Sequence, residues 1–305
     1  MSEKFRIIDP FIKEESEPFL EIDILETRLT PFTGSLIIHG NTSDKSIVTA
    51  KFSTLPGGAE NEWLGQTTAF RAGVQSPKPI ALIQDSTNRL GIVSRHIDGT
   101  DLMKTNEKKD FLDFGSIIKK MHSDIIVDGS IWNRLGKDNF IYYDKYINQW
   151  LNLINSGIIN SPRVHELLKL YARALESRLP YVKPVFTHYD LHDGQVLKDV
   201  IVHKLHLIDF ERWREGDPLD DIAIYLYHNL RMNRPQEFFI DFTRGYLSSK
   251  KFSDLEKGVI NFFLLFTSFK SVDYYQRFRS KDLPVALTQL EKVEKYVSEE
   301  KLFKY

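Results

Sequence analysis

Residues 185–197 read VFTHYDLHDGQVL, and residues 205–210 read LHLIDF. The β-branched and aromatic residues of these stretches predict short strands, and the polar run between them predicts a loop. This arrangement can hold Asp190 near a reacting hydroxyl group, while the amide oxygen of Gln195 and the carboxylate of Asp209 bind a hard cation such as Mg²⁺. Phosphoryl transfer needs these functions, because a carboxylate must accept the hydroxyl proton and oxygen ligands must hold the metal ion.

The order and spacing of these residues resemble those of a known family, the aminoglycoside phosphotransferase and choline kinase-like small-molecule kinases. In that family a His-x-Asp sequence is followed by Asn five residues after the Asp, then by Ile-Asp about a dozen residues on, and then by Gly-Asp-Pro-x-x-Asp. The matching residues here are His188, Asp190, Gln195, Ile208, Asp209 and the run Gly216-Asp217-Pro218-Leu219-Asp220-Asp221. The resemblance covers roughly residues 20–225 and is most specific from 188 to 221.

The resemblance implies an ATP- and Mg²⁺-dependent kinase that phosphorylates a hydroxyl group of a small molecule, such as an aminoglycoside, an amino-alcohol or a sugar. It implies that Asp190 is the catalytic residue, which orients and deprotonates the acceptor hydroxyl. Gln195 and Asp209 would hold Mg²⁺ on the nucleotide. His188 and Asp221 would support the structure of the catalytic loop.

A phosphate-binding lysine is implied in the first hundred residues. Lys51 lies in a strand-like run, 47–52, where the family has a lysine that meets the α- and β-phosphates of the nucleotide. Its ion-pair partner is expected on the next helix. Both Glu60 and Glu62 are candidates, and only the count back from Pro77 favours Glu62.

Two further segments are expected to contact the nucleotide. Residues 93–99 resemble the hinge between the two lobes, where backbone groups would bind adenine and where Ser94 and His96 are candidate binding residues. Residues 30–35 contain a single glycine, so the glycine-rich phosphate loop of protein kinases is missing. Thr33 and Ser35 are the candidates for covering the phosphates.

The expected fold class is α+β, with the bilobal architecture of protein kinases. Residues 1–97 should form a small nucleotide-binding N-lobe with an antiparallel sheet and one helix, with the hinge near 93–99. Residues 100–305 should form a larger, mainly helical C-lobe that contains the catalytic loop 188–197 and the substrate pocket. The pattern of apolar residues predicts strands over 22–29, 35–39, 47–52, 80–84, 90–97, 184–187 and 205–208, and helices over 59–72, 109–121, 142–155, 163–178 and from 221 to the end, with a break near 233–235.

Two positions depart from the family pattern. Gln195 stands where most relatives have Asn, and it keeps a carbonyl oxygen for Mg²⁺ but carries an extra methylene group. Asp193 replaces the usual Pro, which removes a rigid turn and adds a charge near the acceptor hydroxyl. The glutamine also occurs in kinases that resemble the maltokinase branch, so it does not indicate an inactive enzyme.

Composition excludes several other classes of function. The 305 residues include no cysteine, so disulfides, thiolate metal sites and a cysteine nucleophile are excluded. A net charge of -1 supplies no basic field for nucleic-acid binding. The charged N-terminus lacks the apolar segment of a signal peptide, and the most apolar run, 262–266, is too short to cross a bilayer. We therefore expect a cytoplasmic protein with no nucleic-acid or membrane partner.

The nature of the acceptor stays open at this point. Only eleven residues separate Asp209 from Asp221, too few for the activation segment on which protein substrates dock, so a small-molecule acceptor is favoured. Aromatic residues after 221 could form a cage for a quaternary amine, although most have the spacing of a helix core. Scattered carboxylates could form an acidic platform for amino groups, namely Asp241, Asp273, Glu211 and Glu215.

Two other functions remain as alternatives to the kinase. One is a catalytically weak pseudokinase that binds a nucleotide or metabolite, for which Gln195 and Asp193 would be signs of drift. The other is a two-metal hydrolase that uses His188, Asp190, His192 and Asp209, although this histidine and aspartate spacing is a weak metal-site pattern.

Overall fold

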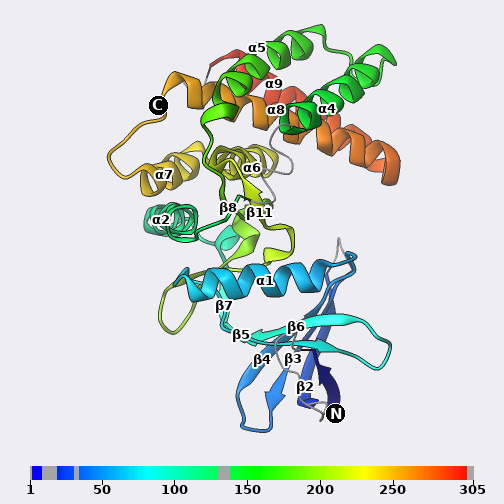
Figure 1. The fold of residues 1–305 in the computed structure, drawn as a ribbon, viewed down its shortest axis with the longest axis vertical. Coiled ribbons are helices and arrows are strands. Elements are labelled where there is room, and N and C mark those ends of the chain that lie inside the picture. The colour runs from blue at the N-terminus through cyan, green and yellow to red at the C-terminus, as the bar shows by residue number, and fades with distance from the viewer. Residues whose placement is uncertain (1, 9–18, 31–33, 130–137, 301–305) are drawn as a thin grey trace. The chain divides into compact units, whose positions relative to one another are not determined.

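The computed structural model describes residues 2–8, 19–30, 34–129 and 138–300, and these form two compact units. The first unit comprises residues 1–105 and 193–213, and the second comprises residues 106–192 and 214–305. Antiparallel strands with one long helix make up the first unit, and helices dominate the second (Figure 1). The α+β fold class predicted from the sequence is confirmed.

A closed antiparallel barrel forms most of the first unit. Its strands are β1 (Ser2–Ile7), β2 (Phe19–Leu29), β3 (Leu36–Thr42), β4 (Ile47–Phe52), β5 (Pro79–Gln84) and β6 (Leu90–Arg95). They pair in the order β1-β2-β3-β4-β6-β5, and β1 closes the barrel by pairing with β5. Alternate residues of each strand fill the interior, as Val48, Ala50 and Phe52 of β4 show. Side chains between them, such as Lys51, therefore point away from the core.

Helix α1 (Gly58–Arg71) and a small sheet complete the first unit. The sheet contains β7 (Gly99–Asp101), β9 (Val196–Asp199) and β10 (Leu205–Leu207), in the order β10-β9-β7. Gly65 of α1 lies so close to Trp213 that a Cβ atom would stand 2.3 Å from its Cδ1 atom. The pairing of β9 with β7 and the packing of α1 on Trp213 explain why residues 193–213 belong to this unit, whereas the division expected near residue 97 assigned them to the C-lobe.

The second unit is a group of helices with one two-stranded sheet. Its helices are α2 (Lys108–Asp124), α4 (Asp138–Asn155), α5 (Pro162–Arg178), α6 (Pro218–Arg231), α7 (Gln236–Leu247), α8 (Asp254–Phe278) and α9 (Leu283–Ser298), and β8 (Val185–Thr187) pairs with β11 (Arg214–Gly216). Helix α8 is central, because residues on all its sides are buried from Gly258 to Val272. Helices α2 and α7 touch at two glycines, Gly115 of α2 and Gly245 of α7. A Cβ atom on either glycine would lie 1.9 Å from a backbone oxygen of the other helix.

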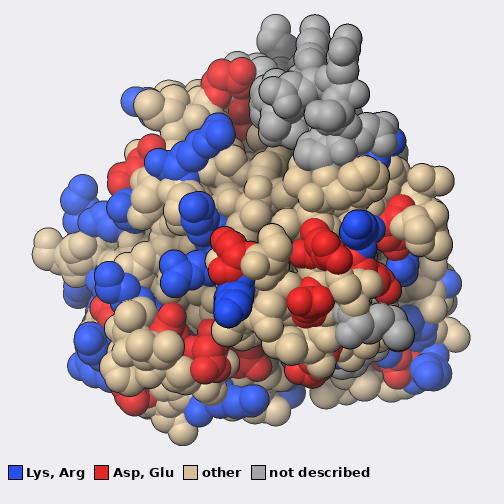
Figure 2. Space-filling model, turned by 90° about the horizontal axis from the view of Figure 1, so that it is seen from below, with Lys and Arg blue, Asp and Glu red and all other residues tan. Residues whose placement is uncertain are grey.

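The surface of the described residues carries mixed charge. Figure 2 shows lysine and arginine side chains interspersed with aspartate and glutamate side chains on one face, in keeping with the net charge of -1. Within the described ranges, no helix is long and apolar enough to span a membrane.

Candidate active site

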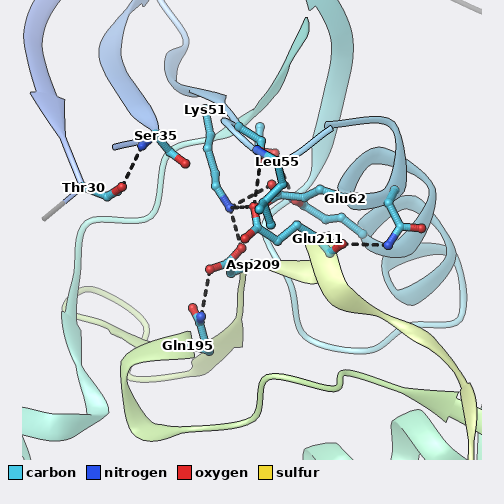
Figure 3. Close-up of polar contacts among 12 residues, drawn as sticks. Thr30, Ser35, Lys51, Leu55, Glu62, Gln195, Asp209 and Glu211 are labelled. Carbon is cyan, nitrogen blue, oxygen red and sulfur yellow. Dashed lines mark hydrogen bonds and ion pairs between the residues drawn. The ribbon is translucent and has the colours of Figure 1, made fainter. Parts of the chain in front are cut away.

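Lys51 is the centre of an ion-pair cluster in the first unit (Figure 3). Its Nζ atom lies 3.0 Å from Oε2 of Glu62 and 3.2 Å from Oε2 of Glu211, and it also contacts Oδ1 of Asp209. Strand β4 aims Lys51 away from the barrel core, and α1 supplies Glu62 from its buried face. Glu60 is exposed. The structure therefore assigns the ion pair with Lys51 to Glu62, the choice that the sequence favoured without deciding it.

The cluster contains more negative than positive charge. Three carboxylates, Glu62, Asp209 and Glu211, surround the single ammonium group of Lys51. Burial raises the pKa of Glu62 to about 7; Asp209 and Glu211 also raise it, while Lys51 opposes the shift. Burial alone would lower the pKa of Lys51, but the carboxylates raise it above its ordinary value. The lysine therefore stays charged, and the net negative charge of the cluster favours the binding of a further cation.

This charge imbalance predicts that Glu62→Gln stabilises the protein at alkaline pH in the absence of divalent cations. The folded-state pKa of Glu62, about 7, lies above the ordinary value of 4.5. Between these values the folded state binds more protons than the unfolded state, so the free energy of unfolding of the wild type falls as pH rises. Glutamine keeps a hydrogen bond to Lys51 and removes this cost, which is about 1–3 kcal/mol.

The measurement is urea denaturation of both proteins with a chelator, from about pH 5 to about pH 8. The difference between the two curves should be smallest at the acid end and should grow in favour of the variant as pH rises to the alkaline end. A constant difference across the range would contradict the raised pKa of Glu62.

Gln195 and Asp209 form the second part of the cluster. Asp209 has a left-handed backbone, with φ of 67°, immediately before a short helical turn over 210–212. Nε2 of Gln195 donates a hydrogen bond to Oδ2 of Asp209 over 2.8 Å, and the backbone oxygen of Gln195 accepts one from the N–H of Ile208. The predicted pair of metal-binding residues is thus brought together within one unit.

Oxygen atoms of the kind that bind a divalent cation gather in this cluster, and Nζ of Lys51 already contacts the three carboxylates among them. Glu62, Asp209 and Glu211 each offer a ligand atom, and these atoms lie within 4.8 Å of one another. Mg²⁺ prefers such oxygen ligands, and a half-turn of the Gln195 amide would present Oε1 in place of Nε2 toward Asp209. The extra methylene of Gln195 therefore does not prevent its amide from reaching Asp209.

The other residues expected to contact the nucleotide make different hydrogen bonds within the protein. Ser35 is buried, and its N–H donates to Oγ1 of Thr30 over 2.9 Å. Oγ of Ser94 accepts a hydrogen bond from Gln66 over 2.8 Å. Nδ1 of His96 lies 2.9 Å from Oγ1 of Thr49. Thr33 lies outside the described residues.

Backbone groups of the expected hinge are partly used by the fold itself. The N–H groups of Arg95 and His96 donate to the backbone oxygens of Lys78 and Ile47. These two donors therefore belong to the sheet, and a base that binds along 93–99 must use other atoms of the segment.

The catalytic loop lies in the second unit, where Asp221 holds its backbone. Oδ2 of Asp221 accepts the N–H of His188 over 2.8 Å, and Oδ1 accepts the N–H of Tyr189 over 2.8 Å. His188 and Asp221 are both 0% exposed. Tyr189 has a left-handed backbone, with φ of 64°, a conformation that costs energy in a tyrosine. Two hydrogen bonds to one buried carboxylate keep this turn in place, one residue before Asp190.

Two residues that the sequence analysis missed complete this support. Nε2 of His122 lies 3.0 Å from Oδ2 of Asp221, and Nδ1 of His122 lies 3.0 Å from the hydroxyl of Tyr246. Burial alone would raise the pKa of Asp221, but the hydrogen bond and charge of His122 and the N–H of His188 lower it. His122 lies in the last turn of α2 and Tyr246 in the last turn of α7, so no local pattern in the sequence connected either residue with the loop.

A sequence model of the phosphotransferase enzyme family matches residues 55–257. The chain belongs to this family. The match spans two thirds of the chain and includes Glu62, the catalytic loop and Asp221.

Solved structures with the same fold include phosphotransferases of several specificities. A spectinomycin phosphotransferase in complex with ADP and spectinomycin is 15% identical, with a TM-score of 0.64 and coverage of 92% of this chain and 94% of that one. The GDP complex of an aminoglycoside 2'-phosphotransferase is 15% identical, with a TM-score of 0.63 and coverage of 89% and 93%. A choline/ethanolamine kinase family protein from Mesorhizobium loti is 15% identical, with a TM-score of 0.59 and coverage of 97% and 92%. A search of curated protein sequences finds no significant match.

The family resemblance and the enzyme class expected from the sequence are therefore confirmed: the chain is a phosphotransferase of the small-molecule kinase class. Within this phosphotransferase, Lys51, Glu62, Gln195 and Asp209 come together in the first unit. His188, Asp190 and Asp221 belong to the second unit, where Asp221 supports the backbone that leads into Asp190.

Proposed function

We propose that the protein is an ATP- and Mg²⁺-dependent kinase that transfers a phosphoryl group to a hydroxyl of a small molecule. The observation that carries the proposal is the cluster in which Lys51, paired with Glu62, contacts Asp209 while Gln195 bonds to the same carboxylate. A fixed cation beside oxygen ligands is the arrangement that a nucleotide with its metal ion requires. Membership of the phosphotransferase enzyme family supports the same reaction type.

The residues of the candidate site have different tasks in this proposal. Gln195 and Asp209 would hold Mg²⁺, which supplies charge neutralisation of the phosphates when bound. Lys51, kept charged and oriented by Glu62, would neutralise phosphate charge from its fixed position on β4. Asp190 would accept a hydrogen bond from the acceptor hydroxyl and take its proton as the new bond to phosphorus forms. His188 and Asp221 would act only by holding the loop backbone.

The nucleotide is proposed to be ATP, with the base near 93–99 and the phosphates covered by residues near Ser35. Related folds carry ADP in one structure and GDP in another, so this fold accepts either purine. Ser94 and His96 are proposed as nucleotide-site residues because they lie in the expected hinge segment. The acceptor class, an aminoglycoside, amino-alcohol or sugar-like alcohol, is proposed from the range of acceptors in the names of these relatives.

A thermal-shift measurement followed by an acceptor screen tests the proposal. The melting temperature should rise only when ATP and Mg²⁺ are both present, and ADP should be released when a suitable alcohol is added. Stabilisation by nucleotide that is indifferent to Mg²⁺ would favour a pseudokinase. Stabilisation by Mn²⁺ or Zn²⁺ without nucleotide would favour a metal-dependent hydrolase.

A further inference from the structure

Two histidines share one threonine hydroxyl in the first unit. Nδ1 of His39 lies 3.0 Å from Oγ1 of Thr49, and Nδ1 of His96 lies 2.9 Å from the same oxygen atom. The two imidazole rings meet edge to face, with centroids 4.9 Å apart. His39 of β3 pairs with Thr49 of β4, and His96 directly follows β6. The threonine hydroxyl therefore links two rings that come from different parts of the barrel.

The histidine pair lies toward one end of β4, and Lys51 lies toward the other. Thr49 precedes Lys51 by two residues, so both side chains leave the same face of β4, about 7 Å apart along the strand. The N–H of His96 donates to the backbone oxygen of Ile47, so the 93–99 segment meets β4 at the end beyond Thr49. A nucleotide with its phosphates at Lys51 and its base along 93–99 would therefore pass Thr49 and end beside His96.

A single hydroxyl group couples the tautomers of the two rings. Oγ1 of Thr49 carries one hydrogen, so it donates to Nδ1 of one histidine and accepts from Nδ1–H of the other. When His96 donates to Thr49, its Nε2 atom carries a lone pair, and when His96 accepts from Thr49, its Nε2 atom carries a hydrogen. The change of direction moves protons from His96 through Thr49 to His39, while Nε2 of His39 releases a proton to water and Nε2 of His96 takes one up. The total number of protons is unchanged, and every group of the chain is satisfied in both arrangements.

The surroundings of the pair favour a neutral His39 and leave Nε2 of His96 available to a ligand. Burial lowers the pKa of His39, repulsion by His96 and Arg28 acts in the same direction, and Glu26 opposes the shift. Neutrality matters because a protonated imidazole has no nitrogen that can accept a hydrogen bond. His96 is half-buried, and its Nε2 atom makes no hydrogen bond to another residue that the structure describes.

We infer that His96, coupled through Thr49 to His39, binds the group at position 6 of the purine base, so that the protein uses both ATP and GTP as phosphoryl donors. The inference rests on the proposed kinase function and adds the nucleotide specificity. Adenine carries an amino group at position 6, which donates to the lone pair of Nε2, and guanine carries a carbonyl oxygen, which accepts from Nε2–H. Exchange of one nucleotide for the other therefore requires only a reversal of the hydrogen bonds through Thr49.

The first test compares non-hydrolysable analogues of ATP and GTP, each with Mg²⁺, by titration calorimetry on the full chain. The wild type should bind the two within about threefold of each other, whereas a site with a fixed hydrogen-bond direction leaves one purine unpaired and discriminates about ten- to a hundredfold. His39→Lys supplies only donors, so Thr49 must donate to His96, Nε2 must carry the hydrogen, and the ratio of affinities should shift about ten- to a hundredfold toward GTP.

Two matched variants control for the added charge and for the loss of the ring. His39→Gln should keep the wild-type ratio, because an amide can donate to Thr49 or accept from it. His203→Lys adds the same charge at an exposed position of the same unit and should also keep the ratio. An unchanged ratio in His39→Lys, or a wild type that binds ATP with Mg²⁺ and rejects GTP, would overturn the inference and leave the kinase intact.

The second test observes the tautomers directly in the wild type, by nuclear magnetic resonance of the full chain labelled with ¹⁵N-histidine. The nitrogen shifts distinguish a bare ring nitrogen from a protonated one, and the spectra of His39→Gln and His96→Gln assign the signals. Nε2 of His96 should be bare in the complex with the ATP analogue and protonated in the complex with the GTP analogue, and His39 should show the opposite change. The same tautomer of His96 in both complexes would contradict the inference, and failure of both analogues to bind with Mg²⁺ would refute the kinase itself.

Discussion

Replacement of Asp190 by asparagine is expected to lower kcat by about 10²–10⁴-fold, the usual contribution of general-base catalysis. Asparagine has nearly the same shape and can still accept a hydrogen bond, but it cannot take the proton of the acceptor hydroxyl. The backbone that leads into residue 190 is held by Asp221 through the N–H groups of His188 and Tyr189, so the loop should keep its conformation in the variant. The measurement is ADP release under saturating nucleotide, Mg²⁺ and acceptor.

The affinity for nucleotide separates a catalytic defect from a folding defect in this variant. Mg²⁺ and ATP should raise the melting temperature of Asp190→Asn as much as that of the wild type, because Lys51, Gln195 and Asp209 are untouched. Asp254→Asn is a matched control, since this carboxylate is 89% exposed at the start of α8. Undiminished turnover in Asp190→Asn would falsify the assignment of Asp190 as the base.

Strand and helix periodicity predicted most of the fold, and the failures have a physical cause. Strand β4 buries every second residue, namely Val48, Ala50 and Phe52, so its alternating apolar residues indicated a strand directly. Strand β1 buries fully only Phe5, and it exists because it pairs with β2 and β5. Strands β7 and β9 are three and four residues long and pair across a gap of about a hundred residues. Elements stabilised mainly by distant partners leave little local signal.

The same distinction applies to the candidate site. The spacing from His188 to Asp221 predicted the loop residues as a group, because the short chain between these residues restricts how far apart they can lie. The choice between Glu60 and Glu62 depended on the rotation of α1, whose buried face includes Glu62 and Gln66 while Glu60 is exposed. His122 of α2 contacts Asp221, Tyr246 of α7 contacts His122, and Lys270 of α8 contacts Tyr189, each at a sequence separation of about 80 residues or more. Tertiary contacts of this kind cannot be derived from a periodic pattern.

Asp209→Asn is expected to shift the Mg²⁺ dependence of nucleotide binding to much higher Mg²⁺ concentrations. The carboxylate accepts from Gln195 and contacts Lys51, so asparagine removes the negative charge at the centre of the cluster while preserving its size. Loss of a residue that supports a metal ion costs 10–100-fold in affinity, and loss of a direct ligand should cost at least about 100-fold. Titration of Mg²⁺ at fixed ATP, read by melting temperature and by ADP release, measures the effect.

The matched variant for Asp209→Asn is Gln195→Asn, which installs the residue that most relatives carry. Its shorter amide keeps an oxygen for Mg²⁺, so the Mg²⁺ requirement should persist, with a change in affinity far smaller than that in Asp209→Asn. Lys51 retains its ion pairs with Glu62 and Glu211 in both variants. A difference between the two variants therefore does not come from the loss of the whole ion-pair cluster. If Asp209→Asn kept the wild-type response to Mg²⁺ and ATP, the metal ion would have to be held by other residues, and the division of labour between Asp209 and Asp190 would be wrong.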